Sequence, residues 1–456
     1  MELMKRVLIR TLPVLIFTIM SCSKDMNVSS ADIVTLIDNG LYVSKTDTVI
    51  KSTDAVKVAN LFSFKGAEVT KSNSSKRVRS VNEFKDSESE LGVYVVNYEG
   101  GGWVLVSSTK KHYPILAYSD KGSFDTDTLN GVSLYVDSYK KEINRKHKLP
   151  MSEVKAEMEA WKVYEERNLP ETCLTRNSDE LTSFIGQSVL TWQQEGYDVY
   201  SITEDVIDGL PIEVLEEFRT IARNAEDYGD EYHNTSFVLK KSEANQPNYN
   251  NYMLSTEWHQ EGVYNDQLDG DYPLGCGTVA IGQILWYHGK YSDWSWVGKI
   301  TNIDSIGVFL KNIRDRIATN SQTGETNVYQ IKSMLRSEDY DFLDATPSNT
   351  NVPYVLSNYG PIFMHGQSSS SGHAWVCDGS TSYNSYRIYK LMTISIFGEL
   401  EYVENTNYRS STMNHKYFHM NWGWDGDYNG WYTDNSSMEG YDNSRGNIIN
   451  IKPNDD

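Results

Sequence analysis

The stretch DYPLGCGTVAIGQILWYHGK, residues 271–290, places a cysteine between two glycines, directly before an apolar run with helical spacing. The positions that recur on one side of such a helix are Val279, Ala280, Ile284 and Tyr287. A helix N-terminus carries free N–H groups and a partial positive charge, and both favour thiolate over thiol. The pattern therefore predicts a reactive cysteine at a helix mouth. The alternative is a buried, inert Cys276.

The two flanking glycines, Gly275 and Gly277, extend this prediction. Residues without a side chain let a substrate backbone come close to the sulfur. The backbone N–H of Cys276 would then donate to an oxyanion that develops on that substrate. A second donor is available upstream, because STEWHQEGVYND (255–266) contains the side-chain amide of Gln260.

A thiolate nucleophile needs a base, and the sequence offers nine histidines. His373 ends a Ser/Gly-rich run and opens an apolar, strand-like stretch in QSSSSGHAWVCDG (367–379). His288 lies on the same predicted helix as the cysteine, more than three turns away, and is expected to pack. Cys377 follows His373 closely, but no further metal ligands are near, so neither a metal nor another cofactor is expected.

The base in turn needs an orienting group, and YFHMNWGWDGDYNGWY (417–432) supplies one. The side-chain carbonyl of Asn421 would accept the imidazole N–H, and Trp422 would cover that hydrogen bond. The segment DGDYNG at 425–430 imitates the start of a calcium loop, but Ser436 stands where that motif requires Glu. A glycine-rich turn is the better interpretation of this segment.

In chain order the candidates are Gln260, Cys276, His373 and Asn421, which is the order of papain-like proteases. The strings TEWHQEGVYN, GCGTVAIGQILWYH, GHAWVCDG and HMNWGWDG resemble the four motifs of the streptopain family of cysteine peptidases. The resemblance implies Cys276 as nucleophile, His373 as general base and acid, Gln260 as oxyanion donor, Asn421 as orienting residue and Trp422 as its cover. It also implies polypeptide substrates.

A second region carries the same resemblance. GGWVLVSSTKKHYPILAYSDKGSF (101–124) is similar to the inhibitory pro-domain of that family, whose members are made as zymogens and lose the pro-domain by proteolysis. The local pattern here predicts a hairpin through the GGG turn at 100–102, a third strand at 115–118 and a charged helix at about 132–147. A helical pattern also runs through 35–64.

Composition limits the class of partner. Lys plus Arg is 42 and Asp plus Glu is 62, so the net charge is −20, which argues against nucleic acid as a partner. The basic head at Lys5, Arg6 and Arg10 and a short apolar segment predict an export signal at 1–21. Ser21-Cys22 resembles a bacterial lipoprotein cleavage box, in which Cys22 receives the lipid. A plain signal peptide with an incidental Cys22 is the alternative.

These observations divide the chain into a signal peptide (1–21), a lipoprotein tether (22–34), a pro-domain (35–147), a helical connector (148–241) and a peptidase domain (242–456). Helical patterns fill the connector through MSEVKAEMEAWKVYEERN and PIEVLEEFRTIARNAEDYG. From about residue 239 the sequence is polar and loop-like, and Lys240-Lys241 is a candidate activation site, with Arg223 as another. A Tyr-rich insertion at 380–415 separates the histidine and asparagine motifs.

The expected fold is α+β: a papain-like domain with a helical half and an antiparallel β half, preceded by a small α+β pro-domain. The expected function is that of a cysteine endopeptidase, exported and lipid-anchored at the bacterial cell envelope; release when the pro-domain is cut is the alternative to a permanent anchor. Two alternatives remain open. One is a non-enzymatic surface lipoprotein that binds glycan or protein. The other is a cysteine-dependent acyl transferase or isopeptidase on the same fold.

Overall fold

The computed structural model of the 456-residue chain describes residues 43–44, 46–62, 77–85, 89–126, 132–165, 188–193, 195–201, 210, 212, 214–216, 235–244, 252–270, 272–289, 303–367, 372–395, 401–433 and 446–454. The predicted export signal, Cys22, Cys173 and Arg223 lie outside these residues. Among the helices that are described, none combines the length and the apolar character that a membrane crossing requires.

The N-terminal unit is an antiparallel sheet with two helices. Its elements are α2 (Ser52–Leu61), β1 (Val78–Phe84), β2 (Val93–Tyr98), β3 (Trp103–Ser107), β4 (Ile115–Ser119) and α3 (Val132–His147). The predicted hairpin is confirmed, because β2 pairs with β3 around glycines 100–102, all three of which have positive φ. The strand at 115–118 and the helix at 132–147 are confirmed as well. The helical pattern of 35–64 gives a described helix only from Ser52 onward.

The described part of the connector contains both helices and strands, and residues 188–193 are helical. Its described elements are η1 (Met151–Glu153), α4 (Lys155–Trp161), β5 (Asp198–Ser201) and β6 (Thr235–Ala244). The second helix expected in the connector lies largely outside the described residues. The polar stretch after residue 239 was expected to be a loop, but it forms the second half of β6. A strand partner decides this outcome, as tertiary pairing overrides local propensity.

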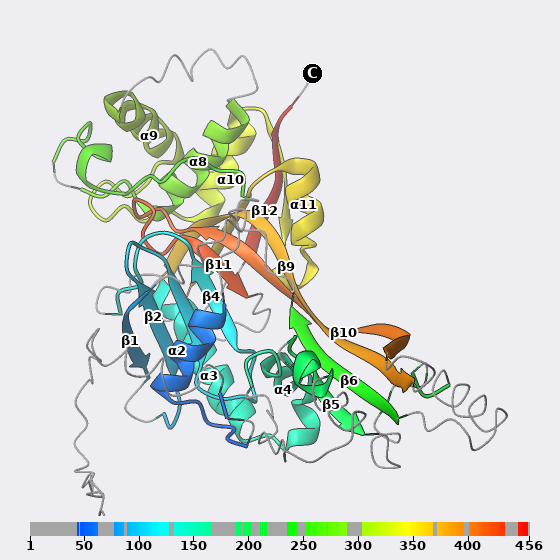
Figure 1. Ribbon diagram of the computed structural model, residues 1–456. Coiled ribbons are helices and arrows are strands. Elements are labelled where there is room, and N and C mark those ends of the chain that lie inside the picture. The colour runs from blue at the N-terminus through cyan, green and yellow to red at the C-terminus, as the bar shows by residue number, and fades with distance from the viewer. Residues whose placement is uncertain are drawn as a thin grey trace, which may run out of the picture.

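The C-terminal part has a helical half and a β half, as expected. The helices are η2 (Gly262–Tyr264), α8 (Cys276–Gly289), α9 (Ile303–Ile317), α10 (Val328–Ser337), η3 (Pro347–Asn349) and α11 (Val352–Tyr359). The strands are β7 (Tyr340–Ala345), β8 (Ile362–Gln367), β9 (Gly372–Ser395), β10 (Glu401–Asn421), β11 (Gly430–Thr433) and β12 (Gly446–Pro453). Figure 1 shows α8, α9 and α10 gathered at one end of the molecule.

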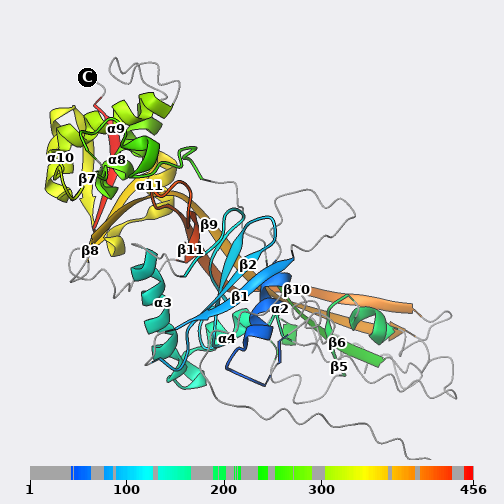
Figure 2. The same cartoon turned by 90° about the vertical axis from the view of Figure 1, so that its left-hand side faces the viewer.

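One continuous sheet runs through both units. The order of its described strands is β1-β2-β3-β4-β11-β10-β9-β8-β12-β7, and β5 and β6 join at β9. The N-terminal sheet meets the C-terminal sheet where β4 pairs antiparallel with β11, with Trp431 opposite Tyr118. Figure 2 shows β1 and β2 on one side of this junction and the helical group on the other.

The hydrophobic core has one cluster within the C-terminal part and two clusters that contain residues of both units. One cluster joins α8, α9 and α10 to the sheet through residues such as Ile284, Leu310 and Val376. A second cluster contains Trp103 and Tyr135 of the N-terminal unit together with Trp422 of the C-terminal part. The two units therefore share buried apolar surface, and that surface lies beside the predicted site.

Candidate active site

Cys276 is the first residue of α8, as the sequence predicts. The helix is more deeply embedded than an amphipathic stripe implies, because every residue from Gly277 to Leu285 is buried. Such a helix is held on all sides by α9, β8, β9 and β12. The thiol is therefore fixed at the N-terminus of a rigid helix. Cys276 itself is half-buried.

The glycines beside Cys276 have a different use from the one expected. Gly275 has φ +90°, and a Cβ there would lie 1.9 Å from the carbonyl oxygen of Gly324. A Cβ on Gly277 would lie 3.2 Å from atoms of Thr326 and Ile331. The segment leading into α10 therefore packs against both glycines, while Gly277 and Cys276 line a cavity together. These glycines let that segment pack against the helix mouth.

His373 lies on β9 and is enclosed by tryptophan rings. It stacks on Trp424 with ring centroids 4.5 Å apart, and more distantly on Trp422 at 5.9 Å and Trp375 at 6.2 Å. Its Nε2 lies 3.2 Å from the backbone carbonyl oxygen of Trp422. A carbonyl only accepts, so this bond assigns the proton to Nε2 and leaves Nδ1 as the basic nitrogen.

The predicted nucleophile and the predicted base lie at one cavity in the fold. Cys276 and His373 line the same cavity, which has a volume of about 1440 Å³. Burial raises the pKa of the Cys276 thiol, while backbone N–H groups of Ala374, Gly277 and Cys276 itself oppose that rise. Since Ala374 directly follows His373, this contact brings the sulfur next to the strand that carries the imidazole.

Both reacting groups are uncharged at neutral pH in this state. Burial lowers the pKa of His373 to about 4, against a smaller upward effect of the Trp422 carbonyl. The sequence predicted that the helix mouth would favour the thiolate at Cys276. The backbone N–H groups do favour it, but the loss of water around the sulfur outweighs them.

Asn421 does not hold the imidazole in this structure. Its Nδ2 donates to the Thr256 carbonyl at 2.7 Å and to Gln283 Oε1 at 3.2 Å. Its Oδ1 accepts from Gln283 Nε2 and from the backbone N–H of Gly423, both at 3.2 Å. The backbone carbonyl of the next residue, Trp422, accepts the hydrogen bond from the His373 ring that the Asn421 side chain was expected to accept. Trp422, which was expected to cover a hydrogen bond between His373 and Asn421, instead stacks on the ring with centroids 5.9 Å apart and has 0% exposure.

Gln283 is a site residue that the sequence reasoning missed. It lies two turns after Cys276 on the same helix and has 0% exposure. Its amide and that of Asn421 exchange two hydrogen bonds, so they connect the nucleophile's helix to the segment beside the base. The sequence did contain a signal for this residue. The Gln side chain lies within the apolar run TVAIGQIL, and its amide must find a hydrogen-bond partner when the helix is buried.

The backbone of Gln260 lies close to the segment that directly precedes Cys276. Its carbonyl accepts a 2.8 Å hydrogen bond from the N–H of Leu274, two positions before Cys276. The residue is half-buried. Among the described residues that line the large cavity, however, Gln260 does not appear.

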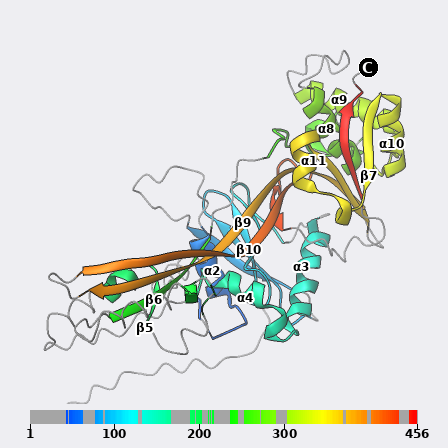
Figure 3. The ribbon, with the colours of Figure 1, turned by 90° about the vertical axis from the view of Figure 1, so that its right-hand side faces the viewer.

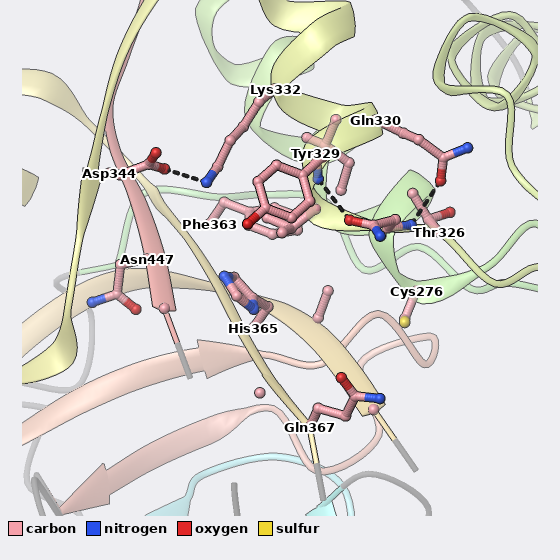
Figure 4. A pocket seen from close by; sticks show the side chains of 18 of the residues that line it. Cys276, Thr326, Tyr329, Gln330, Lys332, Asp344, Phe363, His365, Gln367 and Asn447 are labelled. Carbon is pink, nitrogen blue, oxygen red and sulfur yellow. Dashed lines mark hydrogen bonds and ion pairs between the residues drawn. The ribbon is translucent and has the colours of Figure 1, made fainter. Parts of the chain in front are cut away.

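The cavity walls come from several elements. Phe363, His365 and Gln367 of β8 face it, with Tyr329 and Lys332 of α10 opposite and Asn447 of β12 alongside (Figure 4). Lys332 pairs with Asp344 at 2.6 Å on one wall. Tyr329 has 73% of its surface exposed at the rim. The walls thus offer apolar, amide and charged groups to a chain that reaches Cys276.

The N-terminal unit was expected to block this cleft. Among its described residues none lines the cavity. Instead, Tyr135 of α3 packs edge-on against Trp422 with ring centroids 5.8 Å apart. The hydroxyl of Tyr135 donates to the Thr433 carbonyl at 2.9 Å. The contact therefore reaches the indole that stacks on His373.

The other cysteine that the structure describes is Cys377 on β9, which is buried, forms no disulfide and donates its thiol to the Gly379 carbonyl at 3.8 Å. Within the described part of the chain, no group of three or more His, Cys, Asp or Glu side chains is arranged to hold a metal ion. Asp425, at the start of the calcium-loop imitation, accepts from the Tyr264 hydroxyl at 3.3 Å.

Comparisons with known proteins agree over two regions. Residues 47–143 match the family described as Spi protease inhibitor, and residues 309–432 match the Peptidase C10 family. The second match contains His373, Asn421 and Trp422 and begins after Cys276.

Streptopain of Streptococcus pyogenes serotype M28 is 21% identical over 333 residues, covering 68% of this chain and 75% of its own. Streptopain of serotype M1 is 20% identical over the same length. Among solved structures, a prointerpain A fragment from Prevotella intermedia has 13% identity and a TM-score of 0.37, covering 81% of this chain and 97% of its own.

Proposed function

Because this chain is a member of the streptopain-like family of papain-fold cysteine peptidases with an N-terminal pro-domain, we propose that it is an exported cysteine endopeptidase made as a zymogen. Cys276 is the nucleophile and His373 the general base and acid. The observation that carries this proposal is that both residues line one large cavity, with the Ala374 N–H directed at the sulfur.

The reaction follows from the tautomer of His373. Its Nδ1 takes the thiol proton as the Cys276 sulfur bonds to the peptide carbonyl carbon. The imidazolium then gives that proton to the leaving amine, and a water deprotonated by the same nitrogen cleaves the thioester. The Nε2–H bond to the Trp422 carbonyl holds the ring in this orientation throughout. Asn421 supports the segment beside the ring through its hydrogen bond from the Gly423 backbone N–H.

The oxyanion of the tetrahedral intermediate needs fixed donors. The Cys276 backbone N–H and the side-chain amide of Gln260 fill this role in the proposal. Each such donor contributes roughly 3 kcal/mol to the transition state in other enzymes. The hydrogen bond from Leu274 to the Gln260 carbonyl supports the assignment, because it ties the two donor segments together.

In this proposal the pro-domain at 35–147 inhibits the peptidase by packing against the tryptophan residues that surround His373. Tyr135 packs on Trp422, which covers His373. In this buried environment the imidazole is neutral and the thiol is protonated. Removal of the pro-domain would admit water around the ring, which raises the pKa of His373 toward its ordinary value and allows an ion pair with Cys276.

Export through residues 1–21 and lipid attachment at Cys22 are part of the same proposal. The basic head, the short apolar segment and the Ser21-Cys22 pair support it. The chain would then be tethered to the bacterial cell envelope through residues 22–34. Mass spectrometry of the membrane fraction, comparing wild type with Cys22→Ala, tests it; an unlipidated Cys22 in that fraction refutes the anchor.

The deciding experiment labels the full chain with an epoxide thiol inhibitor and follows casein cleavage. Wild type is expected to label and to cleave, and Cys276→Ala to do neither. Cys377→Ala is the matched control, since it removes a thiol that is fully buried, and it should behave as wild type. Equal labelling of wild type and Cys276→Ala would remove the nucleophile assignment. Product masses that show an amine in place of water would indicate acyl transfer.

A further inference from the structure

The Tyr-rich insertion at 380–415 is a long ribbon formed by the outer parts of β9 and β10, which pair antiparallel from Asn421–Val376 out to Glu401–Ser395. Figure 3 shows the ribbon extending away from the helical group, with β6 and β5 of the connector laid along it. The ribbon therefore carries a segment that precedes the peptidase domain in sequence.

The connector strand is bound along its whole length. All ten residues of β6 have partners on β9, from Thr235 opposite Ile394 to Ala244 opposite Ser385. On its other edge, β6 pairs with β5, where Lys240 lies opposite Asp198. Lys240 and Lys241, the candidate activation site, thus stand inside a strand with a neighbour on β9.

Both faces of this small sheet are covered by apolar side chains from the connector and the insertion together. On one face the buried residues are Trp192, Tyr197, Phe237, Leu239 and Met392. On the other they are Val214, Val238, Tyr389 and Leu391. Neither segment could bury these residues alone, because an isolated two-stranded ribbon is marginally stable in water.

Charged side chains add to this packing. The ammonium groups of Lys241 and Lys390 lie 5.3 and 5.6 Å from the ring centre of Tyr197. Lys241 also pairs with Glu243 at 2.8 Å. The basic side chain that an activating protease would have to recognise is thus engaged within the ribbon.

We infer that β6 belongs to the peptidase and not to its removable pro-region: the β9 edge at residues 385–394 binds residues 235–244, and the mature chain begins N-terminal to β6. The inference builds on the proposed zymogen. A cut at Lys240–Lys241 requires β6 to leave both neighbours first, and the rate of cleavage follows the population of that open state. The boundary at 241/242 expected from sequence moves upstream accordingly.

The test uses the full chain with Cys276→Ala and added trypsin, so that its outcome does not depend on self-processing. Cleavage after Lys240 and Lys241 is followed by mass spectrometry. We expect it to be at least tenfold slower than in the same chain with Leu239→Asp, which places a charge in the buried cluster. Ser242→Asp is the matched control, with the same charge at a half-buried position of the strand, and it should retain protection.

Two results would overturn the inference. The first is trypsin cleavage after Lys240 or Lys241 that is equally fast with and without Leu239→Asp. The second is a self-processed wild-type chain whose first residue lies between 236 and 250. Amide hydrogen exchange covers the case in which Leu239→Asp fails to fold: residues 237–243 of the parent chain must exchange as slowly as β7, and rapid exchange there contradicts a bound strand. The trypsin and exchange results need no peptidase activity, so they decide this inference even if the labelling and casein experiment removes the proposed function.

Discussion

Single side chains and single main-chain groups decide the chemistry of this site. The amide pair of Gln283 and Asn421 is the clearest case, because both residues are buried and each satisfies the other. A buried amide that loses its partner costs about 1–3 kcal/mol. The pair therefore links the stability of the fold to the relative placement of the nucleophile's helix and the loop beside His373.

The first prediction concerns this pair. Gln283→Leu should lower the free energy of unfolding by about 1–3 kcal/mol, since the buried Asn421 amide loses both of its hydrogen bonds to Gln283 and keeps only those to Thr256 and Gly423. It should also reduce kcat more than it changes KM, because the reacting groups lose their alignment. Denaturant unfolding and steady-state kinetics measure the two effects. In a cycle with Asn421→Leu, the double variant should lose less than the sum of the single losses; strict additivity would contradict a direct link.

The second prediction compares two glycines with similar backbone angles. Gly275→Ala and Gly262→Ala both place a side chain at positive φ, +90° and +70°, which costs about 1–2 kcal/mol in each case. Only Gly275 has an obstacle, the Gly324 carbonyl, whereas nothing lies within 4 Å of a Cβ at Gly262. Gly275→Ala should therefore be the more destabilising and should lower activity. Equal unfolding free energies would disprove the close packing at the helix mouth.

At the level of elements, the contact between the N-terminal unit and β10 contains two histidines. His112 follows β3, and His415 lies on β10 with its ring centroid 4.1 Å from that of Tyr113. Burial, and then the nearby Lys146, lower the pKa of His112 to about 3 and that of His415 to about 4. Lys146 itself pairs with Glu157 at 2.6 Å, so a cation is fixed beside both rings.

The third prediction is that this contact weakens in acid. Both folded pKa values lie below the unfolded value of about 6.5, so the unfolded chain binds more protons between pH 6.5 and 4. Stability should therefore fall as the pH drops through this window, by up to about 1.4 kcal/mol per pH unit for each group. Thermal unfolding of Cys276→Ala at pH 7, 6 and 5 measures it. His415→Phe keeps a ring on Tyr113 and should show a shallower pH dependence; an unchanged slope would contradict the prediction.

On the scale of the whole molecule, the pro-domain and the peptidase share one sheet and one core. The β4–β11 pairing joins the sheets, and Tyr135, with 1% exposure, packs among residues of both parts. Units that share this much buried surface are expected to unfold together. The zymogen should behave as one cooperative structure over these two parts.

The fourth prediction tests that cooperativity at Tyr135. Tyr135→Ala should remove about 3–5 kcal/mol of stability, as expected for a large buried aromatic side chain. Tyr135→Phe, the matched control, loses only the bond to the Thr433 carbonyl and should cost about 1 kcal/mol. Circular dichroism and tryptophan fluorescence should report a single transition for the parent chain in denaturant. Two separated transitions in the parent would show that the parts fold independently.

Much of the local structure is predictable from the sequence because it depends on neighbours along the chain. The GGG turn predicts the β2–β3 hairpin, and the glycine-flanked cysteine predicts a helix that begins at Cys276. The sequence motifs also identify Cys276 and His373 as candidate site residues, and in the fold both line one cavity. The polar sequence around Lys240 wrongly predicts a loop, because the strand that it pairs with is distant in the chain, with Tyr389 opposite Lys240.

The sequence by itself determined the type of chemistry, the helix mouth that holds the thiol and the order of the motifs, since these follow from residue identity and short-range spacing. The tertiary structure alone decided that the Trp422 carbonyl orients His373 and that the Gln283 side chain bonds to Asn421. It also decided that burial keeps His373 uncharged and that the connector strand β6 pairs with β9. The physical reason is that desolvation and main-chain hydrogen bonding depend on which distant segments meet. That information is not carried by any single stretch of sequence.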